Sequence, residues 1–161
     1  MAVSKGDKLP DATVLRMGAD GPEQVQMADL TKGRVAVFGL PGAFTGTCSN
    51  AHMPSFIRTA DAFRAKGFDA IYCVTVNDPF VCAAWAEATG SDKAGIAILA
   101  DAAGDFTRAM GLAFDAPPAG LFGRSKRYAL AATDGVIEVI QIEDSPGMCS
   151  VSAGESLLEA V

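Results

Sequence analysis

Short apolar runs alternate with segments of helical spacing along this chain, and this alternation limits the fold more than any other feature. The runs 34–40 and 68–76 are short and apolar, which is typical of buried strands. The segment after each run carries apolar residues at helical spacing. Residues 128–142 then indicate a hairpin, because Asp134-Gly135 separates two apolar runs. The pattern predicts a layered α/β domain whose sheet contains both parallel and antiparallel strands.

Helix boundaries are indicated by capping residues and helix breakers. A helix is expected over about 45–67, with a threonine as its cap and a kink at Pro54. Asp78 is followed by a proline, and this pair favours a second helix with aspartate as the N-cap. Ser152 has Glu155 three residues later, which is capping-box spacing. The spacing predicts a closing helix that begins after Ser152.

Length and charge narrow the class of protein. A chain of 161 residues is expected to form one domain, residues 1–161, around a core that needs no metal or disulfide. Its 13 Lys and Arg stand against 19 Asp and Glu, for a net charge of −6. Nucleic acid and anionic membranes are not expected as partners, because both attract basic surfaces. With no apolar run of transmembrane length and no signal peptide at its start, the chain is expected to be soluble and cytoplasmic.

The residues of this sequence that most directly indicate chemical activity are its four cysteines, which are scattered along the chain. The four are Cys48, Cys73, Cys82 and Cys149. They form no Cys-x-x-Cys pair, so each either fills the core or does chemistry. Cys48 stands where a buried strand has ended and a helix begins, and the free N–H groups of a first helical turn favour the thiolate. The hydroxyls of Thr45 and Thr47 can donate to this sulfur. The alternative is that Cys48 is buried as a small hydrophobic residue.

The residues around Cys48 form a specific motif. Pro41, Thr45 and Cys48 have the spacing Pro-x-x-x-Thr-x-x-Cys, which resembles the active-site motif of peroxiredoxins. The longer string from Pro41 to His52 is similar to the type II, or atypical two-cysteine, subgroup. Other stretches resemble the same subgroup in the same order, namely 76–81 with Trp85, 124–128 and 134–136. Gly46 departs from the subgroup, which commonly has proline there, and we expect it to loosen the loop.

The resemblance implies a thioredoxin-like three-layer sandwich with a mixed central sheet, and it implies a role for each matched residue. Cys48 would be the peroxidatic cysteine that attacks a peroxide oxygen. Thr45 would hold the peroxide, and Pro41 would cover the thiolate. Arg124 would be the activating arginine, because a guanidinium is always charged and offers several fixed donors. Arg127, in the same stretch, is the second candidate for that role.

The remaining cysteines and the only histidine have weaker assignments. The resemblance makes Cys149 the candidate resolving cysteine, because some members carry theirs in such a loop before the last helix. Cys73 lies mid-strand, is expected to fill the core and is the second candidate. Cys82 is expected to be partly exposed and incidental. His52 follows Cys48 by four residues on the same helix face, and we expect a supporting contact rather than a general base.

Two other classes of protein remain as alternatives. A cysteine hydrolase would need a glycine two residues after the nucleophile, where Asn50 stands, and the chain has one histidine only. A zinc module would need close pairs of ligands, which the sequence lacks beyond Cys48 and His52. No metal, flavin or nucleotide cofactor is therefore expected.

The resemblance also implies substrates and partners. The substrates would be hydrogen peroxide and organic hydroperoxides, and the reductant would be thioredoxin, glutaredoxin or glutathione. The family is expected to form a homodimer near the active-site loops. Phe44, Pro79 and Phe80 are the candidate contacts, because apolar residues on surface loops usually meet a partner.

Overall fold

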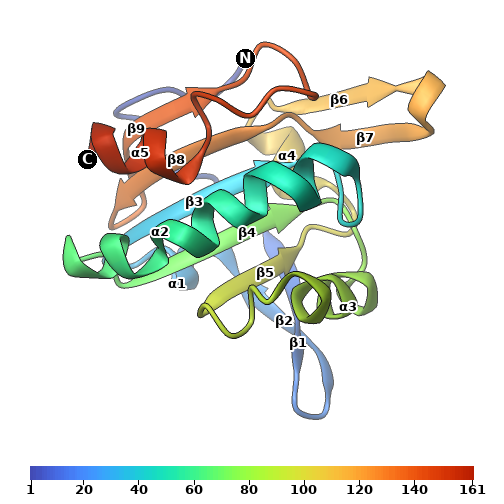
Figure 1. Ribbon diagram of the computed structural model, residues 1–161, viewed down its shortest axis with the longest axis horizontal. Helices are drawn as coiled ribbons and strands as arrows, with labels where there is room; N and C mark the ends of the chain where they lie inside the picture. The colour runs from blue at the N-terminus through green and yellow to red at the C-terminus, as the bar shows by residue number, and fades with distance from the viewer.

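A seven-stranded mixed sheet forms the centre of the computed structural model, which describes residues 1–161 (Figure 1). Its strands are β1 (Thr13–Gly18), β2 (Gly21–Gln26), β3 (Arg34–Leu40), β4 (Ala70–Thr75), β5 (Ile96–Ala100), β8 (Tyr128–Thr133) and β9 (Val136–Ile142). They lie in the order β2-β1-β5-β4-β3-β8-β9. Strands β3, β4 and β5 are parallel, while the outer strands on both sides pair antiparallel. The predicted mixed sheet is confirmed.

Helices cover both faces of this sheet. They are α1 (Met27–Leu30), the π-helix η1 (Cys48–His52), α2 (Met53–Ala65), α3 (Pro79–Thr89), α4 (Asp105–Ala109), the short 3-10 helix η2 (Pro117–Ala119) and α5 (Gly154–Ala160). Successive residues of β3 point to opposite faces, so Phe38 joins one apolar cluster and Val37 the other. The Phe38 cluster packs under α2, α3 and α5, while the Val37 cluster includes Phe106 of α4. These layers confirm the predicted three-layer α/β sandwich.

Several local predictions are confirmed because they depend on short-range chemistry. The predicted strand 34–40 is β3. Asp78 caps α3, and its side chain accepts a hydrogen bond from the Val81 amide at 2.9 Å. The hairpin between β8 and β9 turns at Asp134 and Gly135, whose φ angles of 49° and 80° suit a tight turn between twisted strands.

The helix expected over about 45–67 is present, but it opens with a π-helical segment. Helical backbone runs from Gly46 to Ala65, with η1 followed directly by α2, and Pro54 lies in the first turn of α2, where its missing N–H costs little. Ser152 does not cap the closing helix, which begins at Gly154 after Ala153. The Ser152 hydroxyl instead donates to Glu143 at 2.6 Å, so this side chain is directed toward Glu143 and makes no cap hydrogen bond to α5.

A two-stranded arm was not predicted. Strands β6 (Ala113–Ala116) and β7 (Leu121–Ser125) form this arm, which extends from the body of the molecule in Figure 1. The chain leaves β7 directly for β8, so the arm is joined to the central sheet next to β3. No helix is long and apolar enough to cross a membrane.

Candidate active site

Cys48 lies at the carboxyl end of the central strand. Strand β3 ends at Leu40, a short loop and the first helical residues, Gly46 and Thr47, follow, and η1 begins at Cys48, whose side chain is fully buried. Asn77, beyond the end of β4, fixes this loop. Its side-chain oxygen accepts hydrogen bonds from the Ala43 amide at 2.9 Å and from the Thr75 hydroxyl at 2.7 Å. Because β3 and β4 are parallel, their ends meet at one edge of the sheet and bring Asn77 to the loop.

The two threonine hydroxyls donate to backbone carbonyls and not to Cys48. Thr45 donates to the Gly42 carbonyl at 2.7 Å, and Thr47 donates to the Gly147 carbonyl at 3.2 Å. The expectation that either hydroxyl donates to the sulfur is therefore corrected. The Thr45 bond leaves its oxygen lone pairs free to accept a hydrogen bond from a small molecule in the loop.

The arginine in contact with the sulfur is Arg127. Its Nη2 atom donates to Cys48 Sγ at 3.2 Å, and its side chain is 2% exposed. Arg124, which the sequence favoured for this contact, donates instead through Nη1 to the Pro41 carbonyl at 3.1 Å. The cause is strand register. Tyr128 pairs with Gly39 across β8 and β3, so Arg127 comes at the end of β3 that leads to Cys48.

Arg124 contacts the loop that precedes Cys48. It is half-buried on β7, and Gly42 lies directly beneath it, since a Cβ atom there would come 2.6 Å from Arg124 Nη1. Gly42 therefore permits the close approach that lets Arg124 hold the carbonyl of buried Pro41. This hydrogen bond brings Pro41 and Arg124 together, and it gives Arg124 a contact that holds the loop in place of a contact with the sulfur.

His52 is a neutral partner of Arg127. Burial, reinforced by the positive charge of Arg127, lowers the pKa of His52 to about 3, although its hydrogen bond with the Ser152 carbonyl acts to raise it. A neutral imidazole has one N–H, and Nε2 donates it to the Ser152 carbonyl at 3.0 Å. Nδ1 then accepts from Arg127 Nη1 at 3.0 Å. With its lone pair engaged in this way, His52 does not serve as a general base.

The other cysteines differ in burial. Cys73 is fully buried in β4, and burial raises its pKa well above the ordinary thiol value. Cys82 is also buried, contrary to the expected partial exposure, and burial followed by the Asp78 charge raises its pKa to about 12. Cys149 is half-buried, and burial raises its pKa while the Arg127 charge acts to lower it.

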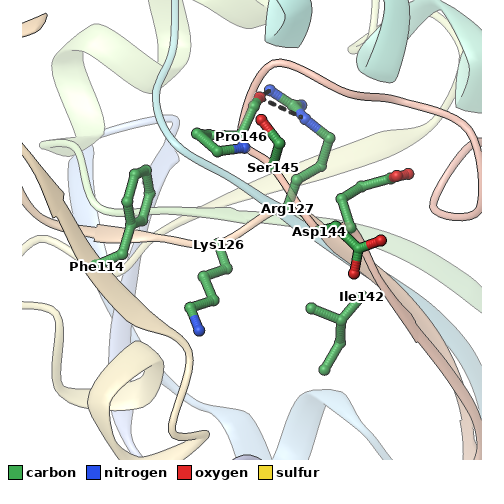
Figure 2. Close-up of a pocket in the computed structure, with 8 residues that line it drawn as sticks. Phe114, Lys126, Arg127, Ile142, Asp144, Ser145 and Pro146 are labelled. Carbon is green, nitrogen blue, oxygen red and sulfur yellow. Dashed lines mark hydrogen bonds between the residues drawn. The ribbon is translucent and has the colours of Figure 1, made fainter.

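The loop that carries Cys149 lies against the site. Arg127 donates to the Pro146 carbonyl from Nε at 3.2 Å and from Nη2 at 2.9 Å, as the dashed lines in Figure 2 show. Thr47 donates to the next carbonyl, that of Gly147. Sequence reasoning missed Pro146 and Gly147, because backbone acceptors leave no residue-type signal.

Two cavities meet at Arg127 and Pro146. One of about 200 Å³ lies between the Pro41–Thr47 loop and the arm, with Ala116 and Leu121 on its wall. The other, of about 460 Å³, lies beneath the Pro146 segment and is lined by Lys126 and Asp144 (Figure 2). The smaller cavity borders the motif that contains Cys48, so a small molecule there would meet Thr45 and Arg127.

Ser49 links η1 to the helix beside it. The indole N–H of Trp85, on α3, donates to the Ser49 hydroxyl at 2.9 Å.

No group of three or more histidine, cysteine, aspartate or glutamate residues could hold a metal ion. A buried thiol held by a guanidinium at the end of a central strand, in a thioredoxin-like α/β sandwich, defines a thiol-based redox protein.

Comparisons with known proteins specify the class further. The Redoxin family model matches residues 4–158. Rice "Peroxiredoxin-2E-2, chloroplastic" is 48% identical over 99% of this chain and 72% of its own, and rice "Peroxiredoxin-2C" is 44% identical over 99% and 98%. The structure of reduced Prx3 from Vibrio vulnificus in complex with H2O2 superposes with a TM-score of 0.90 at 40% identity, covering 98% of each chain. The chain belongs to the peroxiredoxin family, whose members are thiol-dependent peroxidases.

Proposed function

We propose that Cys48 is the peroxidatic cysteine and reduces hydrogen peroxide and alkyl hydroperoxides. The observation that carries this proposal is the hydrogen bond of 3.2 Å from Arg127 Nη2 to the Cys48 sulfur. A guanidinium stays charged at all working pH values, so it stabilises the thiolate form of the sulfur beside it. The cavity of about 200 Å³ next to the motif offers room for a peroxide and the start of an alkyl chain.

The reaction follows from these positions. The Cys48 thiolate attacks one peroxide oxygen, and an S–O bond forms as the O–O bond breaks. The sulfur is oxidised to a sulfenic acid, while the peroxide is reduced and the leaving oxygen takes a proton to become water or an alcohol. Arg127 stabilises the charge as it moves from sulfur to the leaving oxygen. Thr45, held by the Gly42 carbonyl, accepts a hydrogen bond from the peroxide and aligns it with the sulfur.

Peroxide consumption with an added thiol reductant tests the proposal. We expect wild type to consume hydrogen peroxide and Cys48→Ser to be inactive. Cys82→Ser is the matched control, because it removes a buried thiol that makes no contact with Arg127. Turnover by Cys48→Ser at the wild-type rate would show that another group does the chemistry.

The sulfenic acid on Cys48 is proposed to be resolved by Cys149. This cysteine is half-buried in the loop whose Pro146 and Gly147 carbonyls already bond to Arg127 and Thr47. A disulfide requires Cα atoms roughly 4.4 to 6.8 Å apart, and a loop can move to meet that requirement. Cys73 is held in β4 and is the second candidate. A third route is direct attack by an external thiol on the sulfenic acid of Cys48. The external reductant is proposed to be thioredoxin, glutaredoxin or glutathione.

A homodimer near the active-site loops is also proposed. Phe44 and Phe80 are 57% and 66% exposed, and large apolar side chains left on a surface favour an interface. Pro79, which the sequence placed with them, is buried within the chain and is not a contact. Light scattering at micromolar concentration would show a particle of twice 16.6 kDa, and a monomer would reject the proposal.

The working compartment is proposed to be the reducing cytoplasm, because four scattered cysteines without a Cys-x-x-Cys pair do not form the framework of a disulfide-rich protein. Relatives from rice and Arabidopsis are named chloroplastic or mitochondrial, so the family is not confined to one compartment. Cell fractionation followed by immunodetection tests this placement, and enrichment in an organelle fraction would contradict it.

A further inference from the structure

The carboxylate of Glu143 collects four hydrogen bonds from one short segment. Oε2 accepts from the Ser150 amide at 2.8 Å, the Ser152 amide at 2.7 Å and the Ser152 hydroxyl at 2.6 Å, while Oε1 accepts from the Ser150 hydroxyl at 3.2 Å. Glu143 is 7% exposed and takes part in no ion pair. These donors lower the pKa of Glu143 despite the opposing effect of burial. The carboxylate therefore holds a piece of backbone in place.

The segment that Glu143 holds leads to the sulfur through successive contacts. The Ser152 carbonyl accepts from His52 Nε2 at 3.0 Å. The other nitrogen of this ring, Nδ1, accepts from Arg127 Nη1 at 3.0 Å. The same guanidinium donates from Nη2 to Cys48 Sγ at 3.2 Å. Each of these contacts fixes the orientation of the next.

The order of the contacts matters because His52 can support Arg127 in one state only. With its proton on Nε2 and bonded to a carbonyl, the ring presents a lone pair at Nδ1 to the guanidinium. If the Ser152 carbonyl moves away, nothing fixes the proton on Nε2, and it can move to Nδ1. The ring would then present an N–H donor to the N–H groups of Arg127 in place of a lone pair, and the hydrogen bond that orients the guanidinium would be lost.

We propose that Glu143 is a positioning residue for the peroxidatic thiol, acting through Ser152 and His52 to keep Arg127 on Cys48. The proposal rests on the proposed function of Cys48 and adds a residue that contacts neither the sulfur nor the peroxide. The loop keeps two other tethers, from Arg127 to Pro146 and from Thr47 to Gly147. Loss of Glu143 is therefore expected to loosen the segment at Ser152 without releasing the whole loop.

The test uses Glu143→Gln in the full chain, with Asp144→Asn as the matched control. Glutamine keeps the shape but loses the charge, and one of its two terminal groups is an NH2 donor, so it accepts at most three of the four hydrogen bonds, each through an uncharged oxygen. Asp144 is the neighbouring residue, is exposed and makes no hydrogen bond or ion pair, so its variant removes the same charge only. Thermal unfolding of each variant shows whether it is folded.

One readout is independent of activity. His52 is the only histidine, so nitrogen-15 histidine labelling gives the signals of one ring. In wild type and Asp144→Asn we expect a neutral ring with its proton on Nε2 that stays neutral under mildly acidic conditions, in line with its pKa of about 3. In Glu143→Gln the ring should lose this single tautomer, because the carbonyl that fixes the proton on Nε2 is no longer held in place. An unchanged ring would overturn the proposal.

The second readout is the rate constant for oxidation of Cys48 by hydrogen peroxide. We expect a fall of about 10- to 100-fold in Glu143→Gln, the scale of a misplaced reacting group, and no fall in Asp144→Asn. If folded Glu143→Gln is oxidised with the wild-type rate constant, the proposal is overturned, whatever the His52 signals show. An equal fall of the rate constant in Asp144→Asn would also overturn it. If Glu143→Gln does not fold, Ser152→Ala removes one of the four hydrogen bonds, and the same two readouts must move in the same direction.

Failure of this proposal is distinguishable from failure of the proposed function. If Cys48→Ser consumes peroxide as fast as wild type, the peroxidatic assignment fails, and the histidine signals still test the contact chain. If Cys48 is required but Glu143→Gln matches wild type in either readout, the positioning role alone is rejected.

Discussion

Arg127 and Cys48 are 79 positions apart in the chain, yet Nη2 of one donates to Sγ of the other at 3.2 Å, and both side chains are buried. The contact exists because β8 runs antiparallel to β3 and brings Arg127 to the end of the strand that delivers Cys48. It separates the roles of two arginines that stand three residues apart in one motif, and this separation leads to the first prediction.

Arg127→Lys should slow oxidation of Cys48 by hydrogen peroxide by roughly 10- to 1000-fold, the range for a lost charge-stabilising donor. Lysine keeps the charge but cannot bond to Cys48, His52 and Pro146 at once, as the guanidinium does. Stopped-flow measurement of the rate constant checks this. Arg124→Lys is the comparison and should have the smaller effect, since Arg124 contacts the Pro41 carbonyl. The reverse order of the two variants would return the activating role to Arg124.

Cys149→Ser should remove the disulfide of the oxidised protein. Peptide mapping of peroxide-treated wild type under non-reducing conditions should give a linked Cys48–Cys149 peptide, because Cys149 is carried by a loop that already contacts the site. A linked Cys48–Cys73 peptide would assign resolution to the strand cysteine. Absence of any linked peptide, with unchanged turnover of Cys149→Ser on an external thiol, would indicate a one-cysteine cycle.

His52 should make the protein less stable in mild acid. Its pKa is about 3 when folded and about 6.5 when unfolded, so below about pH 6.5 the unfolded state binds a proton that the folded state does not. The free energy of unfolding should therefore fall as pH decreases below about pH 6.5, with a slope that approaches about 1.4 kcal/mol per pH unit near pH 5. Urea unfolding at several pH values measures this slope. His52→Gln should flatten it, and an equally steep slope in that variant would contradict the prediction.

Phe56→Ala should destabilise the fold by about 3 to 5 kcal/mol, the usual cost of removing a buried aromatic ring. Phe56 is fully buried on α2, and its ring stacks on Phe38 of β3 with centroids 4.0 Å apart. Chemical denaturation gives the difference from wild type. Phe122→Ala is the matched control, since Phe122 is 64% exposed, and its free energy of unfolding should stay close to that of wild type.

The parts of the fold that sequence predicts are those with local causes. The apolar run of β3, the Asp78 cap and the Asp134-Gly135 turn each depend on residues within a few positions. Strand β2 escaped prediction because it lies at the edge of the sheet and is mostly exposed, so it shows no alternation of apolar and polar residues. The arm of β6 and β7 is similarly short and half-exposed.

The candidate site also has parts that the local sequence predicts and parts that depend on distant contacts. Pro41, Thr45 and Cys48 were found together because they lie in one loop, whereas the choice between Arg124 and Arg127 depends on the register of two distant strands. Cys82 was misplaced because α3 is apolar on several sides. Its buried face contains Cys82 and Trp85, while Phe80 is exposed.

The hydrogen bond from Trp85 to Ser49 gives the protein an internal optical probe. Trp85 is the only tryptophan, and its indole N–H donates to the residue that follows Cys48. Any rearrangement of η1 during oxidation changes the polarity around this one ring. Emission from the unlabelled protein would therefore follow the opening and closing of the thiol site in real time, with Trp85→Phe as the dark reference.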